Sequence, residues 1–279
     1  MSALGLVLIV AGVTCVFCWV ASLLTKDTSW VDRLWSIVPV VYVWIFAISV
    51  ITNGHDAARL IVMAVVVTFW GLRLTFNFAR KGGYSGVEDY RWAVLRNRMS
   101  PAQFQLFNLF FIVLYQNALL VLITLPAYFA AQHPTALTLW DLLFGVLFLL
   151  FLIGETLADQ EQWAFHQEKA RAEGHLEPGF VTSGLFRYSR HPNFFCEQAQ
   201  WWMIYCLGAT AAATSGLGFF GGALNWTIIG PVLLSVLFIG STKFTESITA
   251  AKYSAYTDYQ RRTSMLIPWP PRTTAGQQL

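Results

Sequence analysis

The residues best suited to binding a charged ligand lie in one stretch, Ser183–Glu197, which reads SGLFRYSRHPNFFCE. Arg187, Arg190 and His191 come before a proline, a residue common in the first turn of a helix, and Asn193 follows it. Because a helix N-terminus favours anions, this loop predicts a site for a phosphate-bearing ligand. The alternative is that the arginines only mark the cytoplasmic side of a membrane protein, which leaves His191 and Asn193 unexplained.

Two other segments place polar side chains at helical spacing inside or beside apolar runs. The first has Arg73, Asn77, Arg80 and Lys81, and the second has Glu155, Asp159, Gln162 and His166. The helix after the proline carries Glu197 and, one turn later, Trp201. A charge inside a membrane costs at least about 2.5 kcal/mol, so such residues are candidates for function. The alternative is that these helices simply leave the membrane there, with solvated ends.

A third cluster near the C-terminus combines tyrosines with arginines. Tyr256 and Tyr259 precede Arg261 and Arg262, and the segment closes with Pro268. Aromatic residues at a membrane interface need no further function. The interleaving also suits a pyrophosphate or a stacked adenine, because tyrosine hydroxyls and guanidinium groups can bind both.

The elements that position these residues are predicted to be membrane helices. The chain has 279 residues, of which 56% are hydrophobic and 12% charged, against about 25% charged in a soluble domain. Apolar runs of membrane-spanning length predict an all-α integral membrane protein with seven transmembrane helices. The predicted spans are Ala3–Leu24, Leu34–Ile51, Leu60–Ala79, Leu106–Ala131, Ala136–Ala158, Gln198–Thr214 and Leu224–Thr242.

The basic residues predict the orientation of these spans. Of the 18 lysines and arginines, Arg59 alone falls on the side of the even-numbered connections, so the other side is expected to be cytoplasmic. The N-terminus then lies outside and the C-terminus in the cytoplasm. The protein is expected in a bacterial inner membrane or the endoplasmic reticulum, as one domain over residues 1–279 with a flexible tail at 272–279. We expect contact with membrane lipid and no obligatory protein partner.

Several classes of protein are excluded or disfavoured by composition. A net charge of +3 gives no basic surface for nucleic acid. The four cysteines lie in apolar stretches, which argues against a disulfide framework, and no His and Cys cluster has metal-ligand spacing, so no metal site is predicted. No G-x-G-x-x-G fingerprint follows a strand, so any dinucleotide has to bind between helices.

The GLFRYSRHPNFFCE stretch, the acidic helix before it and the Tyr-x-x-Tyr-x(8)-Pro ending resemble the steroid 5-alpha-reductase family. This family belongs to a wider group of membrane reductases and methyltransferases. The resemblance implies a seven-helix membrane enzyme that binds NADPH from the cytoplasm. Such an enzyme would reduce the 4,5 double bond of a 3-oxo-4-ene steroid, or a similar lipid enone that enters from the bilayer. Hydride transfer would take place near Glu197 and Trp201.

The resemblance also implies roles for individual residues. Cofactor contacts would fall on Arg73, Arg80 or Lys81, Tyr84, Glu155, Asp159, His166, Asn193, Glu197 and Trp201. The family usually has an asparagine in place of Glu155 and an arginine in place of His166. At the substrate end, Asp32 stands where the family has a glutamate and Trp70 where it has a tyrosine. A protonated Asp32 can donate to a ketone, whereas Trp70 offers only its indole N–H. Alternatively, Asp32 is a surface partner of a nearby base.

Two other functions remain open from the sequence. An S-adenosylmethionine-dependent methyltransferase of the isoprenylcysteine type shares the arginine, histidine and proline motif and the final helix pair. A transporter or scaffold without catalytic activity would bind neither cofactor.

Overall fold

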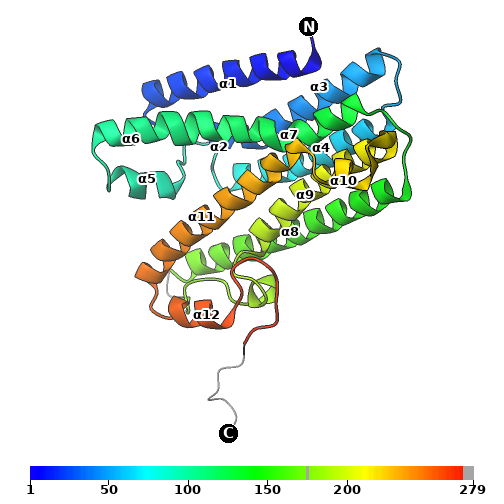
Figure 1. Cartoon of the computed structure of the whole chain (residues 1–279). Coiled ribbons are helices and arrows are strands. Elements are labelled where there is room, and N and C mark those ends of the chain that lie inside the picture. The colour runs from blue at the N-terminus through cyan, green and yellow to red at the C-terminus, as the bar shows by residue number, and fades with distance from the viewer. Residues whose placement is uncertain (174–175, 273–279) are drawn as a thin grey trace. The chain divides into compact units, whose positions relative to one another are not determined.

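The computed structural model describes residues 1–173 and 176–272. Its elements are, in chain order, α1 (Ala3–Thr25), α2 (Trp30–Trp35), α3 (Val38–Thr52), α4 (Ala58–Arg80), α5 (Tyr90–Arg96), α6 (Pro101–Phe107), η1 (Asn108–Tyr115), α7 (Gln116–Gln132), α8 (Leu139–Arg171), η2 (Gly184–Arg187), α9 (Pro192–Ala212), η3 (Ala213–Leu217), α10 (Gly218–Ala223), η4 (Trp226–Ile228), α11 (Ile229–Lys252) and α12 (Tyr256–Arg262) (Figure 1). No strand forms among these described residues, although Ser189 and Ser264 form an isolated bridge.

Seven helical segments are long and apolar enough to cross a membrane, which confirms the predicted count. The protein is therefore a multi-pass integral membrane protein. The fourth span begins at Pro101, earlier than predicted. The reason is a capping box, in which the Ser100 hydroxyl accepts from Gln103 N at 3.3 Å and the Gln103 side chain accepts from Ser100 N at 3.0 Å. The fifth span continues through its polar face to Arg171.

The chain forms two compact units. Unit 1 contains Met1–Phe148 and Trp201–Leu234, and unit 2 contains Leu149–Gln200 and Ser235–Leu279. The single membrane domain over residues 1–279 stays a prediction, and within its expected tail residues 273–279 lie outside the described part of the chain.

Helices of unit 1 approach closely at glycines, as is common in membrane proteins. Pro126 interrupts α7 and has no N–H for the carbonyl of Leu122, four residues earlier. Gly230 of α11 packs on this carbonyl, and a Cβ there would lie 2.3 Å from the Leu122 oxygen. At Gly71 of α4 a Cβ would lie 2.6 Å from the Ser36 oxygen. Both positions require glycine because backbone atoms occupy the space of a side chain.

A buried ion pair joins the first residues of α4 and α8 in unit 1. Arg59 Nε donates to Asp141 Oδ1 at 2.6 Å and Nη2 donates to Oδ2 at 2.9 Å, with side chains 4% and 3% exposed. Thr138 donates twice more to the same carboxylate, through N at 2.7 Å and Oγ1 at 2.9 Å. Arg59, the basic residue predicted to lie on the side opposite the cytoplasm, is thus paired with a carboxylate.

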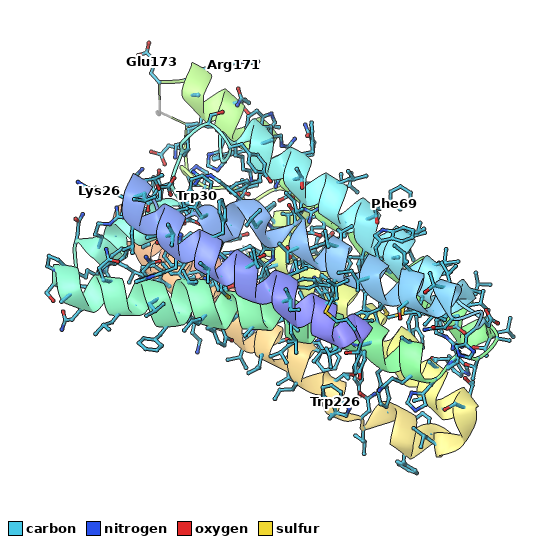
Figure 2. The ribbon with its side chains drawn as sticks, turned by 90° about the horizontal axis from the view of Figure 1, so that it is seen from above. Lys26, Trp30, Phe69, Arg171, Glu173 and Trp226 are labelled. Atoms are coloured by element: carbon cyan, nitrogen blue, oxygen red, sulfur yellow. The ribbon has the colours of Figure 1, made fainter. Side chains whose placement is uncertain are left out.

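An aromatic side chain of α4 lies on the outer surface of unit 1. Figure 2 shows Lys26 and Trp30 at one end of this unit and Trp226 toward the other, with Phe69 pointing outward from α4. Phe69 is 51% exposed, as expected of a side chain that faces lipid.

The C-terminal segment of unit 2 is fastened to the loop before α9. Arg190 N donates to Ser264 O at 2.8 Å and Trp269 N donates to Tyr188 O at 2.9 Å. The Ser189 hydroxyl donates to Leu266 O at 2.7 Å. These bonds fix the loop that carries the predicted phosphate site.

Candidate functional site

The centre of unit 2 is the carboxylate of Glu246 on α11, which is 5% exposed. Arg190 donates to it twice, with Nε to Oε1 at 2.6 Å and Nη2 to Oε2 at 3.0 Å. His191 Nε2 lies 3.1 Å from Oε1, and the Tyr256 hydroxyl donates to Oε1 at 3.3 Å. Gln260 Nε2 donates to Oε2 at 2.9 Å. One buried carboxylate therefore holds side chains from the loop before α9 and from α12.

These contacts occupy the residues expected to bind phosphate. The remaining Arg190 nitrogen, Nη1, donates to the carbonyls of Gln260 (3.0 Å) and Thr263. A phosphate at Arg190 and His191 would have to displace a carboxylate that already neutralises the guanidinium. Arg187, by contrast, is exposed. The arrangement does not fit a cofactor phosphate held by Arg190 and His191, although their assignment as cofactor residues stays a prediction.

Buried acids line α8 and the start of α9 in unit 2. Glu155, Asp159 and Glu197 are 2%, 4% and 6% exposed. Asn193 Nδ2 donates to Asp159 Oδ1 at 3.3 Å, and Gln200 Nε2 donates to Glu155 Oε2 at 2.6 Å. The structure thus brings together the acidic face of α8 and the amides of α9. His166, further along α8, is exposed.

The two predicted cofactor tyrosines belong to an aromatic cluster around Phe180. Ring centroids lie 4.9 Å from Phe180 to Tyr256 and 5.5 Å from Phe180 to Tyr259. The Tyr259 hydroxyl donates to Phe186 O. Burial raises the pKa of both phenols, so they stay protonated donors at neutral pH. Both hydroxyls are engaged within unit 2, and their part in cofactor binding stays a prediction.

Unit 1 holds the other predicted residues at the ends of α2 and α4. The carboxylate of Asp32 accepts from Trp92 Nε1 of α5 at 3.1 Å. The Tyr84 hydroxyl donates to Arg33 O at 2.9 Å, and Arg33 forms an ion pair with Asp27. Among the contacts described, Asp32 thus pairs with Trp92 and Arg33 pairs with Asp27. They do not include the ion pair between Asp32 and a neighbouring base that was the alternative expectation.

The end of α4 carries the predicted basic contacts. Arg80 Nε donates to Asn77 Oδ1 at 2.9 Å, one turn earlier, and its guanidinium lies 5.5 Å from the centre of the Phe76 ring. Arg73 is half-buried, whereas Lys81 is exposed. The helix ends at Arg80, and Gly82 has a φ of +84°, a left-handed conformation that glycine adopts readily.

Two predicted residues meet in the interior of unit 1. The indoles of Trp70 and Trp201 are 0% and 2% exposed and pack edge to face, with centroids 4.9 Å apart. Neither indole N–H has a hydrogen-bond partner in the described part of the chain. The structure joins Trp70 to Trp201, and Asp32 to Trp92, but none of these described contacts links Asp32 to Trp70.

Sequence reasoning missed Glu246. It follows the apolar run of the last span and was not assigned to any motif, although a glutamate inside a membrane helix is itself a signal. Its partners lie 56, 55, 10 and 14 residues away in the chain, so only the fold reveals them.

The fold defines a multi-pass membrane protein, and unit 2 contains a polar centre around the buried carboxylate of Glu246. Residues 18–263 match a family described as proteins of unknown function, DUF1295, and the chain belongs to that family.

Two relatives are similar in sequence. Uncharacterized protein C594.04c of Schizosaccharomyces pombe is 37% identical over 266 residues, which cover 90% of this chain and 75% of that protein. A methanethiol S-methyltransferase of Mycobacterium tuberculosis is 32% identical over 106 residues, which cover 37% of this chain and 36% of that protein. No solved structure matches the chain significantly.

Proposed function

We propose that the protein is a membrane-embedded methyltransferase that uses S-adenosylmethionine, with its N-terminus outside and the chemistry at the cytoplasmic side. The acceptor is an apolar molecule with a nucleophilic atom, such as a thiol, that reaches the protein from the bilayer. The observation that carries the proposal is that Arg190 and His191 are both paired with Glu246. Because the carboxylate occupies the two residues that were expected to bind phosphate, these residues do not suit a phosphate-bearing cofactor.

The acids of unit 2 suit this cofactor. Carboxylates bind ribose hydroxyls, and they favour the positive charge of a sulfonium or ammonium group. Glu155, Asp159 and Glu197 are buried carboxylates on adjacent elements of unit 2. The same acids would repel a 2′-phosphate. The partial match to a methanethiol S-methyltransferase supports the same choice.

The methyl donor would supply an electrophilic carbon, and the protein would supply alignment and exclusion of water. When a neutral thiol accepts the methyl group, the thiol sulfur forms a bond to the methyl carbon. The bond between that carbon and the sulfonium sulfur breaks, and a proton leaves the thiol. Asp159, Glu155 and Glu197 would hold the cofactor, and no residue is assigned as the base.

Cofactor binding tests the proposal directly. The full chain in lipid nanodiscs is titrated with S-adenosylmethionine and with NADPH by calorimetry. We expect saturable binding of S-adenosylmethionine, weakened about tenfold or more in Asp159→Asn, because hydrogen bonds to a charged group contribute about 1.5–3 kcal/mol. Glu168→Gln, at an exposed position of the same helix, is the matched control and should bind as the unaltered chain does. Saturable NADPH binding without S-adenosylmethionine binding would refute the proposal.

A second candidate is the NADPH-dependent reduction of a steroid-like enone. It is favoured by the resemblance of the RHPN segment and by the basic end of α4, where Arg73, Arg80 and Lys81 offer positive charge outside unit 2. Product mass separates the two reactions. A gain of two hydrogens by a 3-oxo-4-ene steroid supports reduction, and a gain of one methylene unit by a thiol supports methyl transfer.

A further inference from the structure

A row of polar side chains runs through the interior of unit 1, where α1 packs against α3, η1 and α7 (Figure 1). We call this row the polar seam. It consists of Thr14, Cys18, Ser22, Tyr42, Asn108 and Asn117, each no more than 9% exposed. The three residues from α1 are spaced by four positions, so they form one buried face of that helix. Such side chains commonly hydrogen-bond across the helices of a membrane bundle, so members left without a partner are candidates to bind a ligand.

The members of the seam lie in three pairs. Asn108 Nδ2 donates to the Ser22 hydroxyl at 3.0 Å. Asn117 lies close to the Cys18 thiol, and Thr14 lies close to the Tyr42 hydroxyl. Because Ser22, Cys18 and Thr14 follow one another at steps of four along α1, the three pairs lie in one row.

Three atoms of the seam have no hydrogen-bond partner in the described part of the chain. They are the side-chain oxygens of Asn108 and Asn117 and the hydroxyl of Tyr42. The amide nitrogen of Asn117 is satisfied, because it donates to Val113 O at 2.8 Å. Thr14 gives its own proton to Val10 O at 2.8 Å. Leaving such atoms unsatisfied is costly, and lipid tails cannot satisfy them.

The backbone is irregular at the same place. Residues Asn108–Tyr115 form a π-helix between the two asparagines. A π-helix is rare and is found frequently at functional sites. This observation is independent of the side-chain bonds, and it points to the same segment.

We propose that the polar seam binds neutral hydroxyl groups, which donate to the amide oxygens of Asn108 and Asn117 and accept from the Tyr42 hydroxyl. No Lys, Arg, Asp or Glu belongs to the seam, so an anion would lack a counter-charge there. The carboxylate of Asp32, whose charge acts on the Cys18 thiol, accepts from Trp92 Nε1. The hydroxyl belongs either to water or to the polar end of a lipophilic molecule from the bilayer. The proposal does not depend on which reaction the protein catalyses.

The lipid-borne source is tested with a photoreactive probe. The full chain in nanodiscs is labelled with hexadecanol that carries a diazirine, and in parallel with its methyl ether, which cannot donate a hydrogen bond. We expect the alcohol to label α1, η1 or α7 in preference to the ether, in competition with unlabelled hexadecanol. Asn117→Leu should weaken this competition about fivefold, the value of one hydrogen bond. Thr124→Val should not, because this buried residue of α7 donates to Val121 O within its own helix.

The water source is tested by radiolytic footprinting, which oxidises side chains next to bound water. We expect Tyr42 to be modified several times faster than Tyr205, which is similarly buried but donates to Ala223 O at 2.7 Å. Protection of Tyr42 by hexadecanol assigns the hydroxyl to a lipophilic ligand, and persistence of the modification assigns it to water. If Asn117→Leu does not fold, Asn108→Leu takes its place in the labelling experiment. No preference for the alcohol, together with equal modification of the two tyrosines, would overturn the proposal.

Discussion

Substitution of Glu246 by glutamine is the sharpest test of how unit 2 is held together. The change keeps the size of the side chain and removes its charge. One oxygen becomes an NH₂ group, which faces an Arg190 N–H in either position, together with the Tyr256 hydroxyl in place of Oε1 or with Gln260 Nε2 in place of Oε2. The Arg190 side chain is only 9% exposed, so it loses its counter-charge in a place that water does not reach.

The expected loss of stability follows from these contacts. Breaking one partner of a buried ion pair costs about 3–5 kcal/mol, because the other charge remains buried and uncompensated. We expect Glu246→Gln to lower the free energy of unfolding by that amount, as measured by SDS titration in mixed micelles. Glu168→Gln, exposed on α8, is the control for the same chemical change and should lie within about 0.5 kcal/mol of the unaltered chain.

A double-mutant cycle then measures the interaction energy between Arg190 and Glu246 separately from their other contacts. Arg190→Met removes the buried charge that Glu246→Gln leaves behind. If the reasoning is right, the double variant is more stable than the sum of the two single effects predicts, with a coupling energy above about 2 kcal/mol. Additive effects, or a Glu246→Gln loss no larger than that of the control, would show that Glu246 does not hold the loop before α9.

Three further predictions concern stability. Arg59→Leu should destabilise the protein by about 3–5 kcal/mol in the same SDS titration, because it strands a buried aspartate, and no loss would contradict the buried pair. Gly230→Ala should lower the thermal midpoint more than Gly12→Ala does, since its Cβ would lie 2.3 Å from the Leu122 oxygen whereas nothing lies within 4 Å at Gly12; equal midpoints would contradict the close approach. Burial alone would raise the pKa of Glu88, but hydrogen bonds from Arg96 and Thr28 outweigh it and hold the pKa below its ordinary value. Glu88→Gln should therefore cost about 1 kcal/mol above pH 5, and this cost should shrink as the pH falls through the lowered folded-state pKa of Glu88; a cost that does not change with pH would contradict the hydrogen bonds from Arg96 and Thr28.

The seven spans could be predicted from the sequence because membrane helices need long apolar runs, and these are local. Element ends were predicted less well. The fourth span starts at Pro101 because Ser100 and Gln103 cap it, a signal that hydropathy does not contain. The fifth helix runs on to Arg171 because polar residues continue a helix outside the membrane as readily as apolar ones do.

The site was predictable only in part, for a physical reason. Helical periodicity predicted the acidic face of α8, and the resemblance implied one cofactor site for Asp159 and Asn193, which the structure places in contact. Residue types alone do not show which charge a neighbour neutralises. The loop sequence made Arg190 look available to a phosphate, whereas its partner lies 56 residues away on another helix.

Two buried ion pairs, Arg59 with Asp141 and Arg190 with Glu246, are satisfied in the same way. Each has two direct bonds between guanidinium and carboxylate, and each carboxylate accepts further bonds from uncharged donors, Thr138 in one case and Gln260 in the other. A charge can remain in a membrane bundle when its counter-charge and its hydrogen-bond partners are all present in this way. This pairing also means that these charges stabilise the fold and are poor candidates to bind a cofactor. Hydrogen-bonding capacity is left over elsewhere, at the indole N–H groups of Trp70 and Trp201 and along the polar seam.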